Sequence, residues 1–195
     1  ERVLNLRSLS ADPDNIPVGD ESMDAFYNSS ILPDIAGPNA RSGKERIKDF
    51  LRKQVQQTKK DGYIIIRDTI SPSHTDVVEV EIRNNDGACD GNIKELSTLA
   101  LFHRFLSLKT SDESSTVTET PSSREGFSRF RGPLEIFTHF ALMKDYREDF
   151  DEEAKRNYCS STQEELEKMI RDLGLRIAIS MPEHNQWIYD NRLKD

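Results

Sequence analysis

The segment DVVEVEIR, residues 76–83, alternates apolar and charged side chains from Val78 onward. Its apolar positions are Val78, Val80 and Ile82, and its charged positions are Glu79, Glu81 and Arg83. A period of two predicts a strand with one face on a core and the other in water. The run YIIIRDTI, residues 63–70, predicts a second strand, and the turn SPSH between them predicts an antiparallel pair. A sheet with one apolar face needs a second layer, so the rest of the chain must supply helices.

Three segments combine helical spacing of apolar residues with start or stop signals. They are residues 42–61, 93–108 and 161–173. The first opens with Ser42 and Glu45 at capping-box spacing. The third ends at Gly174, a residue type favoured just after a helix. These segments predict the helical layer.

Two further stretches predict strands. PLEIFTHFALM, residues 133–143, follows Gly132, and residues 174–191 read as a stop, a strand, a turn and a second strand. The last strand contains Trp187, the only tryptophan, which we expect in the core; its truncation to alanine would then cost about 3–5 kcal/mol. The predicted fold class is α+β: a single compact domain, an antiparallel sheet of about five strands packed with about three helices, preceded by an extended N-terminal arm.

The predicted domain organisation follows from composition. Residues 1–40 contain Pro, Asp and Gly without any period, which predicts an extended acidic arm. Residues 41–195 would form the globular α+β domain, with a flexible Ser/Thr-rich loop at 109–126. Apolar side chains of the arm could dock on a neighbouring copy: Met23, Phe26, Tyr27, Ile31 and Leu32. A disordered acidic tail is the alternative interpretation.

Charge is unevenly distributed along the chain. The net charge is −8, yet residues 41–60 carry eight Lys or Arg against Glu45 and Asp49. A basic helix in an acidic protein predicts a surface that faces phosphates, anionic lipid headgroups or an acidic protein segment. The residues expected to face these anions are Lys44, Lys48, Arg52, Lys53, Lys59 and Lys60. A solvated helix face without a ligand is the alternative.

Motifs typical of enzymes are missing from the sequence. It has no Gly-rich phosphate loop, Gly-x-Ser-x-Gly, Cys-x-x-Cys or His-Glu-x-x-His, and its four histidines show no metal-ligand spacing. The two cysteines, Cys89 and Cys159, do not form a disulfide framework. The sequence therefore predicts a protein that is not an enzyme, with no cofactor, no metal and no small-molecule substrate.

Several short features follow one another in the second half of the chain. They are Gly132, Leu134-Glu135-Ile136, an acidic loop, Ser160-Ser161, Glu167-Lys168, Gly174-Leu175 and Trp187-Ile188-Tyr189-Asp190. In this order they resemble the C-terminal half of the rhabdovirus matrix proteins, best known from the vesicular stomatitis viruses. The resemblance is partial and is that of a divergent member, since the sequence has neither Pro-Pro-x-Tyr nor Pro-Ser/Thr-Ala-Pro.

The resemblance implies a structural viral matrix protein that self-associates into a helical or sheet-like assembly. Such a protein bridges the helical nucleocapsid, nucleoprotein with its RNA, to the anionic inner leaflet of the envelope and supports virion assembly and budding. It would lie in the virion interior between envelope and nucleocapsid, and in the host cytoplasm, at membranes and in the nucleus.

The charge pattern by itself keeps a second function open. A non-enzymatic regulatory binding module could use the basic helix to grip an acidic protein or nucleic acid. The two functions differ in assembly, because a matrix protein polymerises at low salt and a regulatory module stays monomeric.

Overall fold

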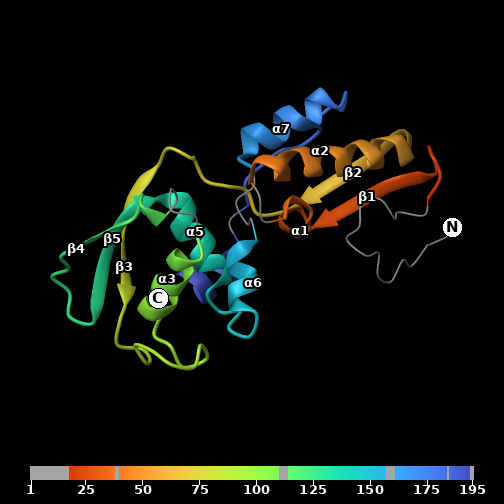
Figure 1. Ribbon diagram of the computed structural model, residues 1–195. Coiled ribbons are helices and arrows are strands. Elements are labelled where there is room, and N and C mark those ends of the chain that lie inside the picture. The colour runs from red at the N-terminus through yellow and green to blue at the C-terminus, as the bar shows by residue number, and fades with distance from the viewer. Residues whose placement is uncertain (1–17, 38–39, 110–113, 157–160, 184, 194–195) are drawn as a thin grey trace.

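The computed structural model describes residues 18–37, 40–109, 114–156, 161–183 and 185–193. Helices and strands are mixed, so the fold class is α+β as predicted. The predicted antiparallel sheet of about five strands with about three helices is wrong, because the described strands form a parallel pair and a separate three-stranded sheet, and more than three helices accompany them. The elements gather into two lobes, each with its own apolar core, as Figure 1 shows. The first lobe contains β1, α1, α2, β2 and α7, and the second contains β3, α3, β4, β5, α5 and α6.

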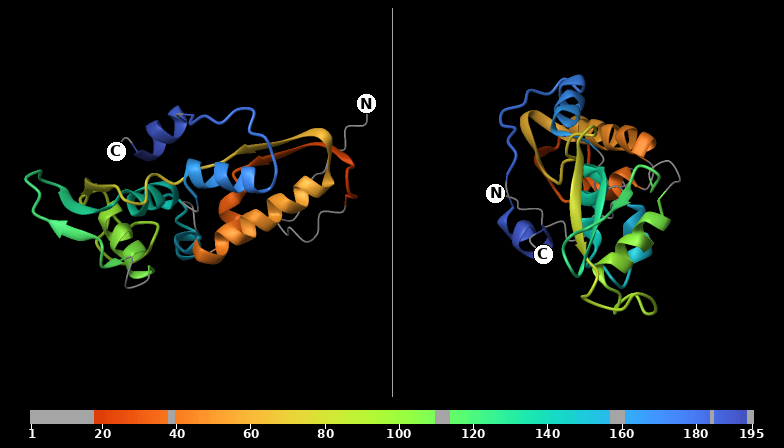
Figure 2. Two further views of the ribbon diagram at one scale, coloured as in Figure 1. Left: turned by 90° about the horizontal axis from the view of Figure 1, so that it is seen from above. Right: turned by 90° about the vertical axis from the view of Figure 1, so that its left-hand side faces the viewer.

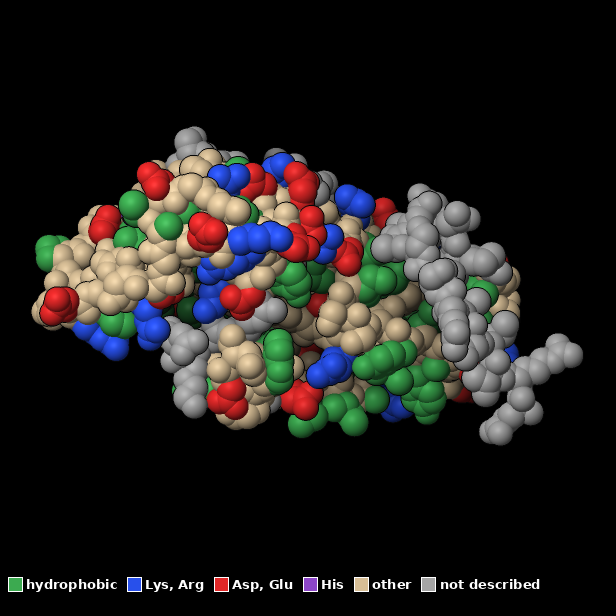
Figure 3. Space-filling view, turned by 90° about the horizontal axis from the view of Figure 1, so that it is seen from below, with side chains coloured by type: hydrophobic (Ala, Val, Ile, Leu, Met, Phe, Trp, Pro, Cys, Tyr) green, Lys and Arg blue, Asp and Glu red, His purple; other side chains and the backbone are tan. Residues whose placement is uncertain are grey.

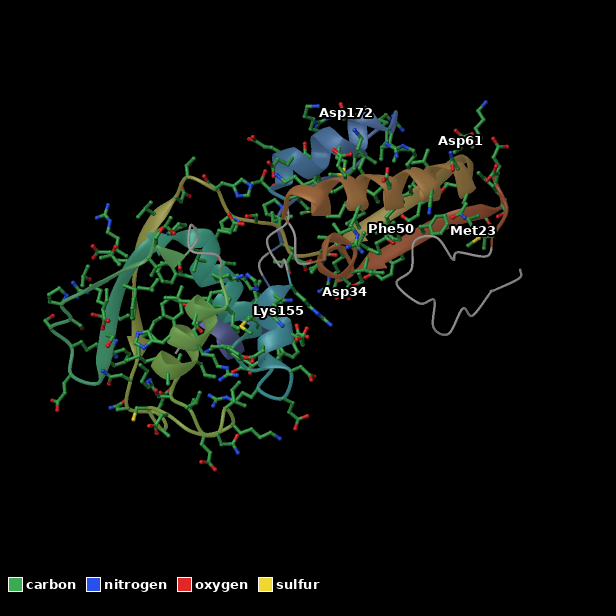
Figure 4. All side chains as sticks on the ribbon, in the orientation of Figure 1. Met23, Asp34, Phe50, Asp61, Lys155 and Asp172 are labelled. Atoms are coloured by element: carbon green, nitrogen blue, oxygen red, sulfur yellow. The ribbon has the colours of Figure 1, made fainter. Side chains whose placement is uncertain are left out.

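The first lobe is built on a parallel pair of strands, β1 (Met23–Ser29) and β2 (Thr58–Arg67). Three helices accompany the pair: α1 (Leu32–Ala36), α2 (Ala40–Gln57) and α7 (Gln163–Asp172). Phe50 of α2, labelled in Figure 4, lies between that helix and the strands. The buried core is Leu32, Ile35, Ala36, Ile47, Phe50, Leu51 and Met169. Apolar residues three and four apart on α2 form one stripe, which explains why this helix covers the pair.

A polar pair is buried beside this core. The side-chain amides of Asn28 and Gln54 exchange two hydrogen bonds, of 2.8 and 2.9 Å, and both residues are buried. Each amide satisfies the other, so neither leaves an unpaired polar group inside the lobe at this contact. The pair fixes β1 against α2.

The second lobe contains an antiparallel sheet of order β3-β5-β4, with β3 at Val77–Arg83, β4 at Thr118–Thr120 and β5 at Phe127–Pro133. Its helices are α3 (Thr98–Ser107), α5 (Leu134–Met143) and α6 (Phe150–Lys155). Phe102 lies at the centre of the aromatic core. Its ring contacts those of Phe105, Phe130, Phe137 and Phe140.

The C-terminal region contains α8 (Gln186–Ile188) and the π-helix η1 (Tyr189–Leu193). Between α7 and α8 the chain runs without regular structure through residues 175–183, and Figure 2 shows how it returns toward the second lobe. The predicted terminal hairpin is therefore wrong. Trp187 is 60% exposed rather than part of the core, and Asn185 caps a short helix instead of turning a hairpin.

Residues 133–143 form a helix and not the predicted strand. Phe137, Phe140 and Met143 are three residues apart, so a helix turns all of them onto the core of the second lobe. The strand lies just upstream in β5, where Phe130 points inward between outward-facing Arg129 and Arg131. The predicted pairing of residues 63–70 with 76–83 is also wrong, because β2 and β3 belong to different sheets.

The described part of the predicted arm, residues 18–37, differs from an extended arm. It folds on its own chain, with β1 paired to β2 and α1 packed in the first core. The carboxylate of Asp68 accepts hydrogen bonds of 2.8 Å from the backbone N–H groups of Ile31 and Leu32, which satisfies the start of α1. Residues 1–17 lie outside the described part. The predicted Ser/Thr-rich loop contains β4, and its residues 110–113 also lie outside.

Candidate functional site

The predicted anion-facing residues lie on α2 and at the start of β2, where acids of the same chain meet several of them. Lys44 Nζ is 2.6 Å from Glu165 Oε1, and Lys59 Nζ is 2.7 Å from Asp24 Oδ1. The other pair is Arg52 with Asp49. These contacts reduce the positive field that the sequence predicts for this helix.

Three predicted anion-facing residues complete this surface. A hydrogen bond from Lys168 is the main cause that lowers the pKa of the Asp172 carboxyl on α7, and the nearby charge of Lys48 adds to this effect. Lys53 is half-buried and Lys60 is exposed. Figure 4 labels Asp172 on α7, above α2. The acidic helix α7 thus lies along the basic one, and anion binding by this face stays a prediction.

The five residues predicted to dock on a neighbouring copy do not share one environment. Leu32 is 3% exposed and belongs to the first core, with Ile31 packed against that core. Met23 and Phe26 are half-buried. Only Tyr27 is largely exposed, at 63%. Strand alternation explains the split, because Phe26 and Tyr27 point to opposite faces of β1.

The outer side of the β1–β2 pair carries large apolar side chains in water. We call Tyr27, Tyr63 and Ile65 the apolar sheet face; Tyr63 is 66% and Ile65 51% exposed. Tyr27 is directly opposite Ile65 in the register, and Ala25 is opposite Tyr63. Figure 3 shows hydrophobic side chains gathered at the lower edge of the molecule in that view. The run YIIIR is typical of a buried strand, but the structure buries only the face of Ile64 and Ile66.

A second surface, which the sequence reasoning missed, lies on the outer side of the three-stranded sheet. Four arginines project from it, and we call this surface the arginine face: Arg83, Arg124, Arg129 and Arg131. In the register of β3 and β5, Glu79 is directly opposite Arg131 and Glu81 is directly opposite Arg129. The signal was present in FSRFRG, residues 127–132, where arginine alternates with phenylalanine.

A cluster of titratable side chains joins the two lobes. His74 precedes β3, and its Nδ1 is 2.8 Å from Glu135 Oε2 on α5. Its Nε2 is 3.2 Å from Glu165 Oε2 on α7, whose other oxygen meets Lys44. The hydrogen bond to Glu135 is the main cause that raises the pKa of His74; burial opposes it, and Glu165 adds to it. Glu135 belongs to the second lobe and Glu165 to the first, so this histidine links them.

Glu165 is tightly held in this cluster. Burial would raise its pKa, but hydrogen bonds from Lys44, the Thr162 N–H and His74 outweigh burial and lower the pKa to about 2. Thr162 and Glu165 also form a reciprocal capping box at the start of α7. A second link between the lobes is the 3.1 Å ion pair from Arg156 to Asp34. Figure 4 labels Asp34 and Lys155, the neighbour of Arg156 at the end of α6, at this junction.

The other histidine with a perturbed pKa lies inside the second lobe. His139 is 6% exposed, and its Nδ1 is 3.0 Å from Lys109 Nζ. Burial, with the nearby Lys109 charge, lowers its pKa to about 3, so the ring stays neutral. It packs edge-on against Phe105, which is the environment of a core histidine and not of a catalytic base in an open cleft.

The described residues carry few features of an active site. Within them no group of His, Cys, Asp or Glu is placed to hold a metal ion, and Cys89 is an exposed free thiol. One surface hollow lies between α7 and residues 175–180, and another lies among Arg104 and the acids of residues 148–152. Among the helices in the described ranges, none is long and apolar enough to cross a bilayer.

Comparison with protein-family models, curated proteins and solved structures gives no match for this chain. The function proposed for this chain therefore rests on its own surfaces.

Proposed function

We propose that this protein is a non-enzymatic structural protein of the viral matrix type, which self-associates and bridges a helical nucleocapsid to the inner leaflet of an envelope. The observation that carries the proposal is the apolar sheet face. Three large side chains from two adjacent strands, each more than half exposed, form one continuous patch. Exposed tyrosine and isoleucine side chains at neighbouring sites are typical of a protein interface.

A second copy of the chain suits this face as its partner. The pair β1–β2 has one side covered by α2 and the other open, and within the described residues it has no third strand. A neighbouring copy packed on the patch would bury these side chains without requiring another protein, and a head-to-tail contact of this kind need not close, so it can build a helix or a sheet. Tyrosine is favoured at such contacts because its ring is apolar and its hydroxyl can reach water.

The matrix assignment adds the partners implied by the order of sequence features in the second half of the chain. Its structural support is the surface pattern alone, because the terminal segment that resembles a matrix strand is helical here. The half-buried Lys48 and the exposed Lys60 would contribute to contacts with anionic lipid or nucleoprotein–RNA.

Light scattering at low salt, across a range of protein concentrations, tests self-association. The variant Tyr27→Lys/Ile65→Lys places two charges in the apolar sheet face, and we expect it to stay monomeric where the wild type assembles. Val77→Lys is the control for a lysine placed at another exposed apolar position, because Val77 is 55% exposed on the other sheet. Electron microscopy of the assembled fraction would show helices or sheets of repeating units.

Three results would count against the proposal. A wild-type protein that remains monomeric at low salt would favour the regulatory binding module. Assembly that Tyr27→Lys/Ile65→Lys leaves unchanged would remove the apolar sheet face from the contact. Equal loss in the Val77→Lys control would point to net charge instead of the specific face.

A further inference from the structure

The arginine face concentrates positive charge on an acidic protein. Its four arginines stand against two glutamates on the same side of the sheet, although the whole chain has a net charge of −8. The exposed fractions of the Arg124 and Arg131 side chains are 60% and 62%. A local excess of positive charge at an exposed sheet surface attracts anions.

Cross-strand pairing explains only part of this surface. Arg129 Nη2 is 3.0 Å from Glu81 Oε1 and holds the pKa of that carboxyl below its usual range. Arg131 Nη1 is 3.9 Å from Glu79 Oε1. Opposite charges directly across an antiparallel pair stabilise the sheet. Both glutamates are used in these pairs, so a further reason is needed for the other two arginines.

Arg83 and Arg124 meet on one aromatic ring. The guanidinium carbon of Arg124 lies 3.7 Å from the centroid of the Phe127 ring, and that of Arg83 lies 5.8 Å from it. Arg124 shares Glu81 at 3.6 Å, whereas Arg83 has no carboxylate partner among the residues that the structure describes. Two like charges held beside one ring repel each other, and a bound anion would relieve that repulsion.

The chemistry of these groups favours a phosphate ligand. A guanidinium that stacks on a ring keeps its N–H donors available at its edge, in a planar fork that matches two phosphate oxygens. Hydroxyl groups lie on the same side of the sheet. Thr118 is opposite Arg131 in the register, and Ser122 Oγ is 3.3 Å from the Glu81 oxygen that Arg129 also contacts.

We propose that the arginine face binds single-stranded RNA, with Arg83 and Arg124 on its phosphates and the exposed guanidinium planes beside unpaired bases. A sheet surface with arginine and an aromatic ring suits single strands, whose bases are free to stack. The hydroxyls of Thr118 and Ser122 can pair with ribose hydroxyls, which a bilayer surface does not offer. This binding needs no self-association and goes beyond the proposed function.

The test uses fluorescence anisotropy with labelled oligouridine, at protein concentrations where light scattering shows a monomer. We expect wild-type binding to weaken as salt rises. The variant Arg83→Gln/Arg124→Gln should bind at least about tenfold more weakly and lower the slope of log K against log salt by about 1.4, since each single-strand phosphate contact contributes about 0.7. Circular dichroism checks that the variant is folded.

A matched control removes the same charge elsewhere. Lys168→Gln/Arg171→Gln also deletes two exposed positive charges, but from α7 in the first lobe, and it should bind the RNA as the wild type does. Equal weakening in both double variants would overturn the proposal, because binding would then follow net charge. Absence of RNA binding by the wild type would overturn it as well.

Vesicles of phosphatidylcholine and phosphatidylserine provide a competing ligand. Binding to these vesicles that depends on Arg83 and Arg124, without binding to RNA, would reassign the face to lipid and refute the RNA assignment. Because the RNA assay is made on the monomer, its failure is distinct from a failure of self-association, which light scattering measures in the absence of RNA.

Discussion

Replacing Phe102 by alanine should destabilise the second lobe far more than a substitution at an exposed position. Its side chain is fully buried in α3, and its ring lies 4.9 Å from that of Phe130, 5.7 Å from Phe137 and 5.0 Å from Phe140. Truncation of a buried phenylalanine costs about 3–5 kcal/mol. Each lost aromatic pair adds about 0.5–1.5 kcal/mol beyond the buried area. We therefore expect the upper end of the range, about 5 kcal/mol.

Trp187→Ala is the control for this prediction. Trp187 is larger than Phe102 but 60% exposed, so its truncation should change the free energy of unfolding by only about 0.5 kcal/mol. Urea unfolding followed by far-ultraviolet circular dichroism would compare the two variants with the wild type. A loss below about 1.5 kcal/mol in Phe102→Ala, or equal losses in both variants, would refute the packing of the second lobe around this ring.

Three further predictions concern single side chains. The folded pKa of His74 is raised, so the stability that its protonated ring contributes is complete below about pH 6.5 and is lost as pH rises through the folded pKa. Thermal melting should therefore show that His74→Gln is less stable than the wild type at about pH 6 and similar to it at about pH 9. The folded pKa of His139 is lowered to about 3, so between about pH 6.5 and 3 only the unfolded chain takes up a proton at this ring, and the free energy of unfolding should fall as the pH is lowered over that range. In urea unfolding measured at a series of acidic pH values, His139→Leu should show a smaller fall. An unchanged fall would contradict the burial of a neutral ring. Thr162→Ala removes the cap of α7 and should cost about 1 kcal/mol by urea unfolding, whereas Thr162→Ser should cost much less; equal losses in the two would show that the hydroxyl cap is not the cause.

Local patterns in the sequence were enough for several elements. The alternation of residues 76–83 predicted β3, and apolar spacing predicted α2 and α7. The predicted end of α2 at residue 61 was too late, because the helix ends at Gln57 and the chain enters β2. These elements are determined by side chains a few residues apart, so the sequence contains the whole signal. Even here the detail differed, since the segment predicted from residue 161 begins with Thr162 as the cap of α7.

The secondary structure of apolar runs without a clear period was predicted wrongly. Residues 133–143 and the neighbourhood of Trp187 fit a strand by composition, but burial against a core decides between strand and helix. For residues 133–143, the helix turns Phe137 and Phe140 onto Phe102. Near Trp187 the segment forms a short helix that joins neither sheet, and the tryptophan side chain stays 60% exposed.

The candidate surfaces depended on contacts between distant segments. Tyr27 and Ile65 are adjacent only because β1 and β2 pair in parallel, and Arg83 and Arg124 meet only because β5 brings Phe127 between them. The sequence by itself determined the charges, the helical stripes and the alternating strand. Tertiary structure alone decided which lysines meet acids and which arginines share a ring, because Coulomb and stacking energies depend on distances in space and not on separation along the chain.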